Sequence, residues 1–249
     1  MKQDHGHPGG SLSIADILTV LYFKEMNIDV NNIKDENRDR FVLSKGHSAP
    51  ALYSALYEKG ILSADDMKNF RKINGILQGH PDMKHTPGID MSTGSLGQGV
   101  SSAVGMAIAG KLDNKKYRVY TILGDGEIEE GQVWEAAMSA SHYKLDNLCL
   151  IIDNNNLQID GAINDVMNSY PIDKKFESFG FNVINIDGHN FQGIEKALES
   201  AKNTKSKPTA IIAKTIKGKG VSFMENQVGW HGKAPSEEQY NQAIEELDA

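Results

Sequence analysis

Residues 117–157 read YRVYTILGDGEIEEGQVWEAAMSASHYKLDNLCLIIDNNNL and contain two short apolar runs with a helical segment between them. The runs Tyr117 to Leu123 and Leu148 to Asp153 are rich in aliphatic and β-branched residues, which predicts two strands. The segment Gly131 to Tyr143 predicts the helix that connects them. Because a helical connection of this length joins parallel neighbours, the stretch predicts an α/β fold built on a parallel sheet.

The alternation of strands and helices extends along the rest of the chain. Further strands are predicted at Arg40 to Leu43, Asn182 to Asp187 and Thr209 to Thr215. Further helices are predicted at Ser11 to Met26, Ala49 to Lys59, Val100 to Leu112 and Ser236 to Leu247. We therefore expect a central parallel sheet flanked by helices, with residues 1–249 forming a single domain.

Two pairs of residues have the spacing of a capping box at a helix start. Ser13 with Asp16 predicts one such start, and Ser63 with Asp66 predicts another. Residues 78–99, in contrast, contain mostly Gly, Pro, Thr and Ser, which predicts a long loop. Loops of this length are usually functional or disordered.

Composition and charge exclude several classes of protein. The 249 residues carry 26 Lys and Arg against 33 Asp and Glu, a net charge of −7, so a nucleic-acid partner is not expected. The longest apolar stretch, Ile17 to Phe23, is far shorter than the ~20 residues that span a bilayer, so no membrane partner is expected either. The single Cys149 allows no disulfide within the chain and favours a reducing, cytoplasmic setting.

The polar residues that follow the first two strands indicate a metal and phosphate site. Asp125 lies in Gly124-Asp125-Gly126, and Asn155 lies 30 positions further on, so both lie where neighbouring strands end. A carboxylate, an amide oxygen and a backbone carbonyl are hard donors that suit Mg²⁺ holding a diphosphate. Either half alone also fits a tight turn or an Asx turn, and the combination favours the site.

The motifs resemble those of a known family. A Gly-Asp-Gly followed after about thirty residues by a pair of asparagines is the signature of thiamine-diphosphate-dependent enzymes. Five further blocks, in the same order along the chain, are similar to transketolases: Gly6-His7-Pro8-Gly9, Arg40 to His47, Gly79-His80-Pro81, Thr93 to Gly99 and Trp230-His231-Gly232. Deoxyxylulose-phosphate synthases and dehydrogenase E1 α subunits share the diphosphate signature, but the blocks from Lys45 to Ser48 and from Thr93 to Gly99 are similar to transketolase.

The resemblance implies a thiamine-diphosphate-binding fold and roles for individual residues. Asp125, Asn155 and the backbone carbonyl of Leu157 would be metal ligands. Cofactor contacts are implied for His47, Gly94, Ser95, Leu96 and Gly126, and also for Asp125, Asn155 and Glu130. His7, His80 and His231 would line the substrate channel and handle hydroxyl protons, and Glu130 would join an acidic relay between active sites.

The residue types and their sequence context support part of the roles that the resemblance implies. His7, His47, His80 and His231 all lie in glycine-rich or proline-rich segments, which are poor candidates for core packing. Imidazole titrates near neutrality, as proton transfer to sugar hydroxyls requires.

Other charged residues near the Gly-Asp-Gly motif have simpler explanations. Glu127 and Glu129 are explained by favourable interaction with a helix dipole. The lysines of the segment from Lys217 to Gly220 are as compatible with solvent exposure as with phosphate binding.

Full-length transketolases continue into pyrimidine-binding and C-terminal domains. The resemblance therefore implies the N-terminal subunit of a split transketolase, with a separate C-terminal subunit in an α2β2 assembly and sugar phosphates as substrates. The predicted reaction is transfer of a two-carbon ketol unit from a ketose phosphate to an aldose acceptor, with thiamine diphosphate and Mg²⁺. The alternatives are a split transketolase for a branched or sulfonated ketose and a non-catalytic, cofactor-binding regulatory subunit.

Overall fold

A computed structural model describes residues 6–248 and contains a five-stranded sheet in the order β1-β2-β3-β5-β4. The strands are β1 (Arg40–Leu43), β2 (Val119–Gly124), β3 (Leu148–Asn154), β4 (Asn182–Asp187) and β5 (Thr209–Lys214). Every neighbouring pair is parallel. The predicted α/β class and all five predicted strands are confirmed, with ends that differ by at most two residues.

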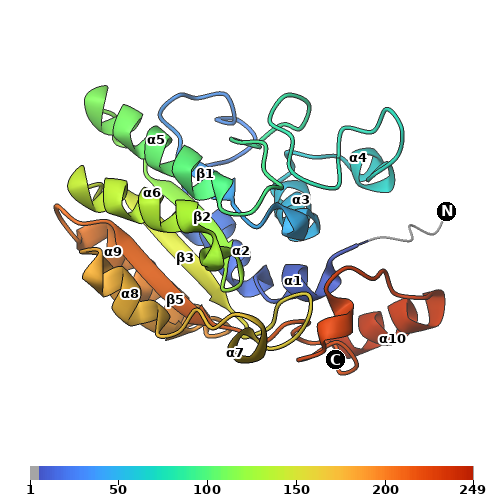
Figure 1. The fold of residues 1–249 in the computed structure, drawn as a ribbon. Helices are drawn as coiled ribbons and strands as arrows, with labels where there is room; N and C mark the ends of the chain where they lie inside the picture. Colours follow the sequence, from blue (N-terminus) through green and yellow to red (C-terminus); the bar gives the residue numbers. More distant parts are fainter. Residues whose placement is uncertain (1–5, 249) are drawn as a thin grey trace.

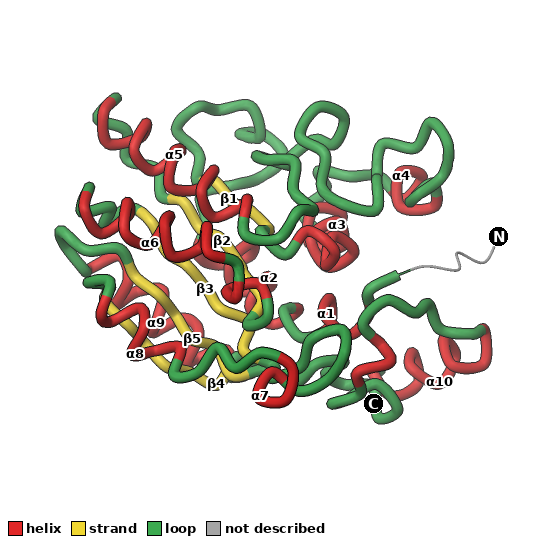
Figure 2. Tube along the Cα trace, in the orientation of Figure 1, coloured by secondary structure: helices red, strands yellow, loops and turns green. Residues whose placement is uncertain are grey.

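Helices cover both faces of the sheet (Figures 1 and 2). They are α1 (Pro8–Leu12), α2 (Ala15–Val20), α3 (Ala49–Glu58), α4 (Ala64–Lys68), α5 (Gln98–Leu112), α6 (Gly131–His142), α7 (Ile163–Val166), α8 (Ile172–Ser178), α9 (Phe191–Asn203) and α10 (Glu237–Leu247). One apolar core lies between the sheet and helices α2, α3 and α9, and a second lies between the opposite face and α5, α6 and α8. Because side chains alternate along a strand, Ile151 packs into the first core and Ile152 into the second.

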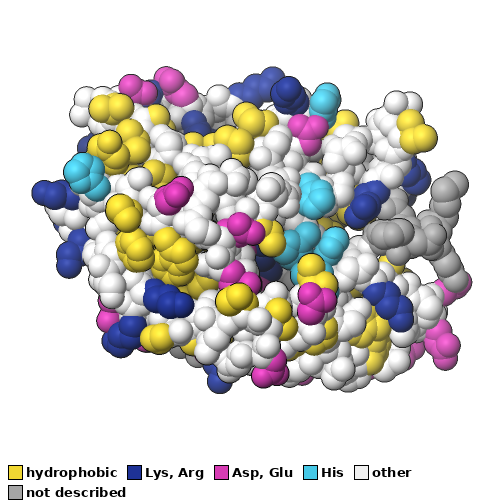
Figure 3. All heavy atoms as spheres, in the orientation of Figure 1, with side chains coloured by type: hydrophobic (Ala, Val, Ile, Leu, Met, Phe, Trp, Pro, Cys, Tyr) yellow, Lys and Arg dark blue, Asp and Glu magenta, His cyan; other side chains and the backbone are white. Residues whose placement is uncertain are grey.

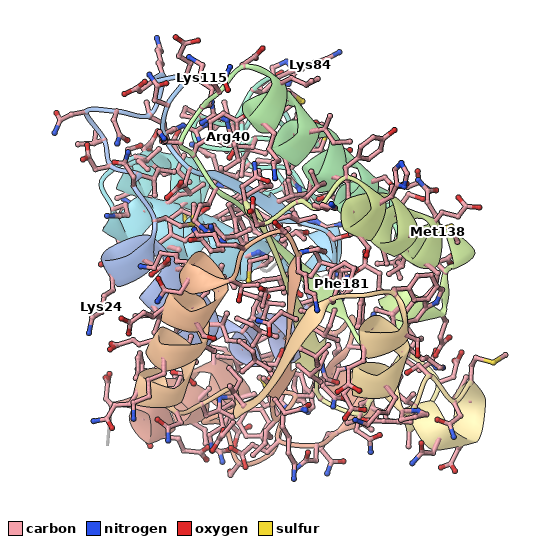
Figure 4. The ribbon with its side chains drawn as sticks, turned by 90° about the vertical axis from the view of Figure 1, so that its left-hand side faces the viewer. Lys24, Arg40, Lys84, Lys115, Met138 and Phe181 are labelled. Carbon is pink, nitrogen blue, oxygen red and sulfur yellow. The ribbon has the colours of Figure 1, made fainter. Side chains whose placement is uncertain are left out.

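The side chains follow this layering (Figure 4). Phe181, which immediately precedes β4, is buried in the second core, where its ring packs against Phe176 of α8. Met138 on α6 and Lys24 at the end of the N-terminal helical region point outwards. No helix in residues 6–248 is long and apolar enough to cross a membrane.

The N-terminal helix departs from its prediction. The segment predicted as one helix from Ser11 to Met26 consists of α1, α2 and a π-helical turn at Leu21–Glu25. The capping box predicted at Ser13 is wrong, because the residue that precedes α2 is Ile14. The Ser13 hydroxyl is fully buried and donates to Asp153 on β3, 2.7 Å away, so a tertiary contact has replaced the local cap.

Other local predictions are confirmed. The side chain of Ser63 accepts from the backbone N–H of Asp66, and the Asp66 carboxylate accepts from the backbone N–H of Ser63, so the capping box of α4 is formed. Residues 78–97 contain no helix or strand. A small third cluster, formed by Val221, Met224, Trp230 and Ala243, joins α10 to the loop that precedes it.

Candidate functional site

The loops that follow the carboxyl ends of β1, β2, β3 and β5 enclose a cavity of about 270 Å³. In Figure 1 the arrow of β3 points towards the part of the molecule where α1 lies, and Gly10 of α1 lines the cavity. Nine of the residues that the sequence singled out line it: His7, His47, Gly94, Leu96, Asp125, Gly126, Asn155, Leu157 and His231. His80, Ser95 and Glu130 do not line it. The sheet thus brings together segments that lie more than 200 residues apart in the sequence.

Asp125 and Asn155 lie side by side because β2 and β3 are parallel and in register. Gly124 pairs with Asp153, so the residues that follow each strand meet at the same edge. The Asp125 carboxylate accepts backbone N–H groups from Asn156 at 2.5 Å and Gly126 at 3.0 Å. The Asn155 side-chain oxygen accepts the backbone N–H of Leu157 at 3.1 Å, which closes an Asx turn.

The electrostatics of Asp125 suit a cation. Its side chain is buried, and burial together with the nearby Asp153 carboxylate raises the pKa of Asp125 to about 7. A bound divalent ion would offset this penalty for the ionised form. The described residues include no group of three or more His, Cys, Asp or Glu side chains arranged to hold a metal ion by themselves, and a site of one carboxylate, one amide and one carbonyl needs none.

The cavity floor has room for a ligand. Gly124 and Gly126 line the cavity, and a Cβ atom on Gly124 would meet no atom closer than 3.8 Å. A side chain at position 124 would therefore occupy the cavity itself. The missing side chain leaves backbone exposed at the end of β2, where a phosphate group can approach.

A buried ion pair at this edge was missed by the sequence analysis. The Lys45 ammonium, which follows β1, lies 2.6 Å from Asp153 Oδ2, and both side chains are almost inaccessible. Ser13, Thr215 and Asn155 also donate to the Asp153 carboxylate. Although burial alone would raise the pKa of Asp153, the Lys45 ammonium and the hydroxyl donors of Thr215 and Ser13 hold it below its usual value.

Lys45 also connects the ion pair to the N-terminal segment. Its ammonium donates to the carbonyl oxygen of Gly10 at 2.7 Å, which joins α1 to the strand ends. Lys45 was part of a block quoted for the family resemblance, but local spacing carries no signal that it pairs with a residue 108 positions away.

The structure adds to the explanation given for Glu127. Glu127 begins a short 3-10 helix, Glu127–Glu129, as a carboxylate at a helix start should, but its side chain is also buried and accepts three hydrogen bonds. The donors are the Ser44 hydroxyl at 2.5 Å, the Gly97 N–H at 2.9 Å and the Gly124 N–H at 3.0 Å. Burial raises the pKa of Glu127, which these hydrogen bonds oppose. Glu127 thereby ties the loop before α5 to the ends of β1 and β2.

Glu129 differs from Glu127. Its side chain is partly buried and accepts a hydrogen bond from the amide of Gln158 at 2.9 Å. This hydrogen bond joins Glu129 to the loop after β3, where Gln158 lines the cavity.

Three histidines form a cluster at the cavity. The rings of His7, His47 and His231 lie 5.0 to 5.5 Å apart, centre to centre. Burial and the neighbouring positive charges keep the pKa of His47 well below its usual value and lower that of His231 to about 4. All three rings therefore lie within reach of one ligand, and Figure 3 shows histidine side chains gathered on this face of the molecule.

Lys217 belongs to the same cluster. The sequence left its exposure open, and the structure buries it with its ammonium 3.0 Å from Nδ1 of His231. Burial and the charge of Lys45 lower the pKa of Lys217 to about 8.

The remaining predicted site residues lie outside the lining of the cavity. His80 is exposed and packs beside Gly94, where a Cβ would lie 3.1 Å from its ring. Burial and the charge of Arg71 lower the pKa of His80. Glu130 is exposed at the start of α6, beside Gly97, and Ser95 is exposed in the same loop.

The geometry agrees with the comparison against protein families, where residues 1–248 match the family model described as transketolase, thiamine diphosphate binding domain. The chain belongs to this transketolase family. It is 47% identical over 243 residues to a 6-deoxy-6-sulfo-D-fructose transketolase subunit of Clostridium sp. strain MSTE9, covering 98% of this chain and 88% of that protein. It is also 46% identical over 245 residues to human transketolase, covering 97% of this chain and 38% of the human protein.

Comparison of this chain with solved structures also shows the transketolase fold. The crystal structure of transketolase from Campylobacter jejuni superposes with a TM-score of 0.93 at 40% identity, covering 98% of this chain and 39% of that one. The chain thus spans about two fifths of the full-length transketolases that it matches, and most of the length of the Clostridium subunit.

Proposed function

We propose that this chain is the cofactor-binding half of a two-subunit transketolase, which transfers a two-carbon ketol unit from a ketose phosphate to an aldose acceptor. The observation that carries the proposal is one cavity in which the buried oxygens of Asp125 and Asn155 lie beside the cluster of His7, His47 and His231. Residues 1–249 would act as one diphosphate-binding domain. The expectation that it works in the cytoplasm stays a prediction.

Three oxygen atoms of this chain would serve as its ligands for Mg²⁺. Asp125, Asn155 and the carbonyl oxygen of Leu157 would bind the ion, which leaves room in an octahedron for two phosphate oxygens and water. His47, Gly126 and the segment from Gly94 to Leu96 would contact thiamine diphosphate. When bound, the cofactor supplies the carbon nucleophile, and the protein supplies orientation and proton handling.

The substrate would meet the histidines. His7, His80 and His231 would hydrogen-bond the hydroxyl and carbonyl oxygens of the sugar, and neutral rings at His80 and His231 are favoured by their lowered pKa values. Glu130, exposed at the start of α6, would contact the neighbouring active site across a subunit interface.

A separate C-terminal subunit, carrying the pyrimidine-binding and C-terminal domains, would complete the site in an α2β2 assembly. Support comes from the match over 88% of a protein that is itself named a transketolase subunit. The same match favours a second candidate, in which the ketose donor is sulfonated or otherwise unusual. A non-catalytic regulatory subunit is disfavoured, because Asp125, Asn155 and the histidines are all present.

Cofactor binding is tested by calorimetric titration of the chain with thiamine diphosphate and Mg²⁺. Asp125→Ala should abolish the Mg²⁺-dependent binding, whereas Asp113→Ala, an exposed control at the end of α5, should bind like the wild type. Equal affinity in Asp125→Ala and wild type would remove Asp125 from the metal site.

Ketol transfer is tested by mixing this chain with its C-terminal subunit, Mg²⁺ and thiamine diphosphate. A rate from xylulose 5-phosphate to ribose 5-phosphate that needs both chains supports the main proposal. A rate only with a 6-sulfonated ketose supports the second candidate. Cofactor binding without turnover of any ketose would favour the regulatory subunit.

A further inference from the structure

A second cavity, of about 390 Å³, lies at the opposite edge of the sheet from the candidate functional site. Segments that lead into β2, β3 and β5 form it, whereas the first cavity lies where the strands end. Lys115, labelled in Figure 4, lies at this edge. β2 is six residues long, and at about 3.3 Å per residue its two ends are ~20 Å apart. A ligand in the second cavity would therefore not touch the residues proposed to bind the cofactor.

The lining of this second cavity is strongly basic. Five of its nine described residues are positively charged: Lys111, Lys115, Lys116, Arg118 and Lys205. Asp146 is the one acidic residue among these nine. Because the whole chain has a net charge of −7, this local excess of positive charge is opposite in sign to the protein as a whole. Like charges held close together repel each other, and a bound anion would remove that repulsion.

The single carboxylate of the lining is already engaged. Oδ1 of Asp146 accepts from the Lys111 ammonium at 2.9 Å, and Oδ2 accepts from the backbone N–H of Ser206 at 2.9 Å. Although burial opposes it, these hydrogen bonds and the charges of Lys111 and Lys205 hold the pKa of Asp146 below its usual value. Asp146 therefore neutralises one of the five positive charges and ties the loop before β3 to the loop before β5.

The other lysines of the lining remain free to meet a ligand. Lys115 pairs at 3.0 Å with Glu36, whose side chain is 76% exposed. The Lys205 ammonium donates to the carbonyl oxygen of Lys202 at 3.1 Å and forms no ion pair within residues 6–248. Lys116 is exposed and has neither a hydrogen bond nor an ion pair within the same residues.

Arg118 adds a second kind of phosphate-binding group. Within residues 6–248 its guanidinium makes one hydrogen bond, from Nη2 to the carbonyl oxygen of Ala201 at 3.1 Å, and its buried Nε has no acceptor. A guanidinium has five N–H donors and can bind phosphate oxygens two at a time. The cavity thus combines one incompletely satisfied arginine with lysines from two separate loops.

We propose that this cavity binds a small phosphorylated molecule, at a site separate from the candidate functional site. A phosphate group carries close to two negative charges at pH 7, so it neutralises more of the lining than a single carboxylate would. A volume of about 390 Å³ lies within the range of small-molecule pockets. The acidic chain as a whole disfavours a nucleic acid. The inference does not depend on the proposed function.

Nuclear magnetic resonance of the ¹⁵N-labelled full chain tests the site without Mg²⁺ or thiamine diphosphate. The chain is titrated at pH 7 with inorganic phosphate and, separately, with pyrophosphate, while sodium chloride holds the ionic strength constant, because salt screens exposed charges. The backbone signals of Asn114, Asn147 and Ser206 should shift and reach saturation, and pyrophosphate should bind more tightly. Shifts that appear only at Gly126 and Leu157, or that sodium chloride alone reproduces, would overturn the proposal.

Charge-removing variants test the recognition. Lys116→Gln and Lys205→Gln each remove one exposed charge from the lining, and each should weaken phosphate binding about tenfold. Lys174→Gln is the matched control, because it removes the same charge from α8, where Lys174 pairs with Glu177. This control and Asp125→Ala should keep the wild-type affinity at the second cavity. Wild-type affinity in both lining variants, or an equal loss in Lys174→Gln, would contradict the proposal.

Discussion

Replacing Lys45 by methionine is predicted to destabilise the fold strongly. The change removes an ammonium that lies 2.6 Å from Asp153 while both side chains are 2% exposed or less. Removing one partner of such a pair leaves an uncompensated buried charge, which costs about 3–5 kcal/mol. Asp153 keeps the donors of Ser13, Thr215 and Asn155, so we expect the lower end, about 3 kcal/mol.

Urea unfolding of the full chain at pH 7, followed by circular dichroism, measures this loss as a lower midpoint at unchanged slope. The matched control is Lys174→Met, because Lys174 pairs with Glu177 at 2.8 Å on the surface, with its side chain 64% exposed. A fully exposed pair of this kind contributes little to stability, so Lys174→Met should leave the midpoint almost unchanged. Equal midpoints for the two variants would refute the reasoning.

The double variant Lys45→Met with Asp153→Asn isolates the interaction itself. Because it removes both charges, the double variant should be more stable than the sum of the two single losses allows. Strict additivity would mean that the ion pair contributes nothing beyond its separate parts.

Three further predictions concern Glu127, the glycines Gly97 and Gly105, and the dependence of stability on pH. Glu127→Gln should lower the unfolding free energy by about 1–3 kcal/mol, because an amide group cannot accept all three donors, and calorimetry should detect it. Gly97→Ala should destabilise the protein, because Gly97 has a φ of 78° and a Cβ there would lie 2.8 Å from the Cβ of Glu130. Gly105→Ala should stabilise the protein by about 1 kcal/mol, because the new methyl group would enter open space beside α5 and alanine favours the helix. The melting temperatures of the two variants should therefore move in opposite directions. Folding lowers the pKa of His231 from 6.5 to about 4, so the unfolded chain binds more protons between these values. Stability should therefore fall from pH 7 to pH 5, by about 1 kcal/mol after allowance for partial solvent exposure, and His231→Gln should reduce that dependence in urea unfolding.

Local patterns predicted most of the architecture. The strand at Arg40–Leu43 was placed correctly to the residue, because the three residues after Arg40 form a short apolar run and are all buried. The pairing of β2 with β3 followed from the intervening helix, and so did the meeting of Asp125 with Asn155.

The local sequence patterns did not predict the contacts between distant segments. Ser13 has the spacing of a helix cap, yet its hydroxyl donates to a carboxylate 140 positions away. Glu127 begins an acidic run that suits a helix start, yet three donors from different loops hold it inside. Local sequence spacing indicates which hydrogen bonds neighbouring residues can form. The packing of distant segments at the end of the sheet determines which of these local bonds are replaced by tertiary contacts.

The arrangement around Asp153 has a consequence for how the protein is made. Its partners Ser13, Lys45 and Thr215 lie between α1 and α2, after β1 and after β5 respectively. During synthesis, a ribosome-bound chain that has emerged only as far as β3 lacks the Thr215 hydroxyl and the neighbouring strand β5, so the carboxylate cannot yet be enclosed. Final closure of this end of the sheet must therefore wait until residue 215 has emerged, and nascent chains that stall before it should stay sensitive to protease near β3.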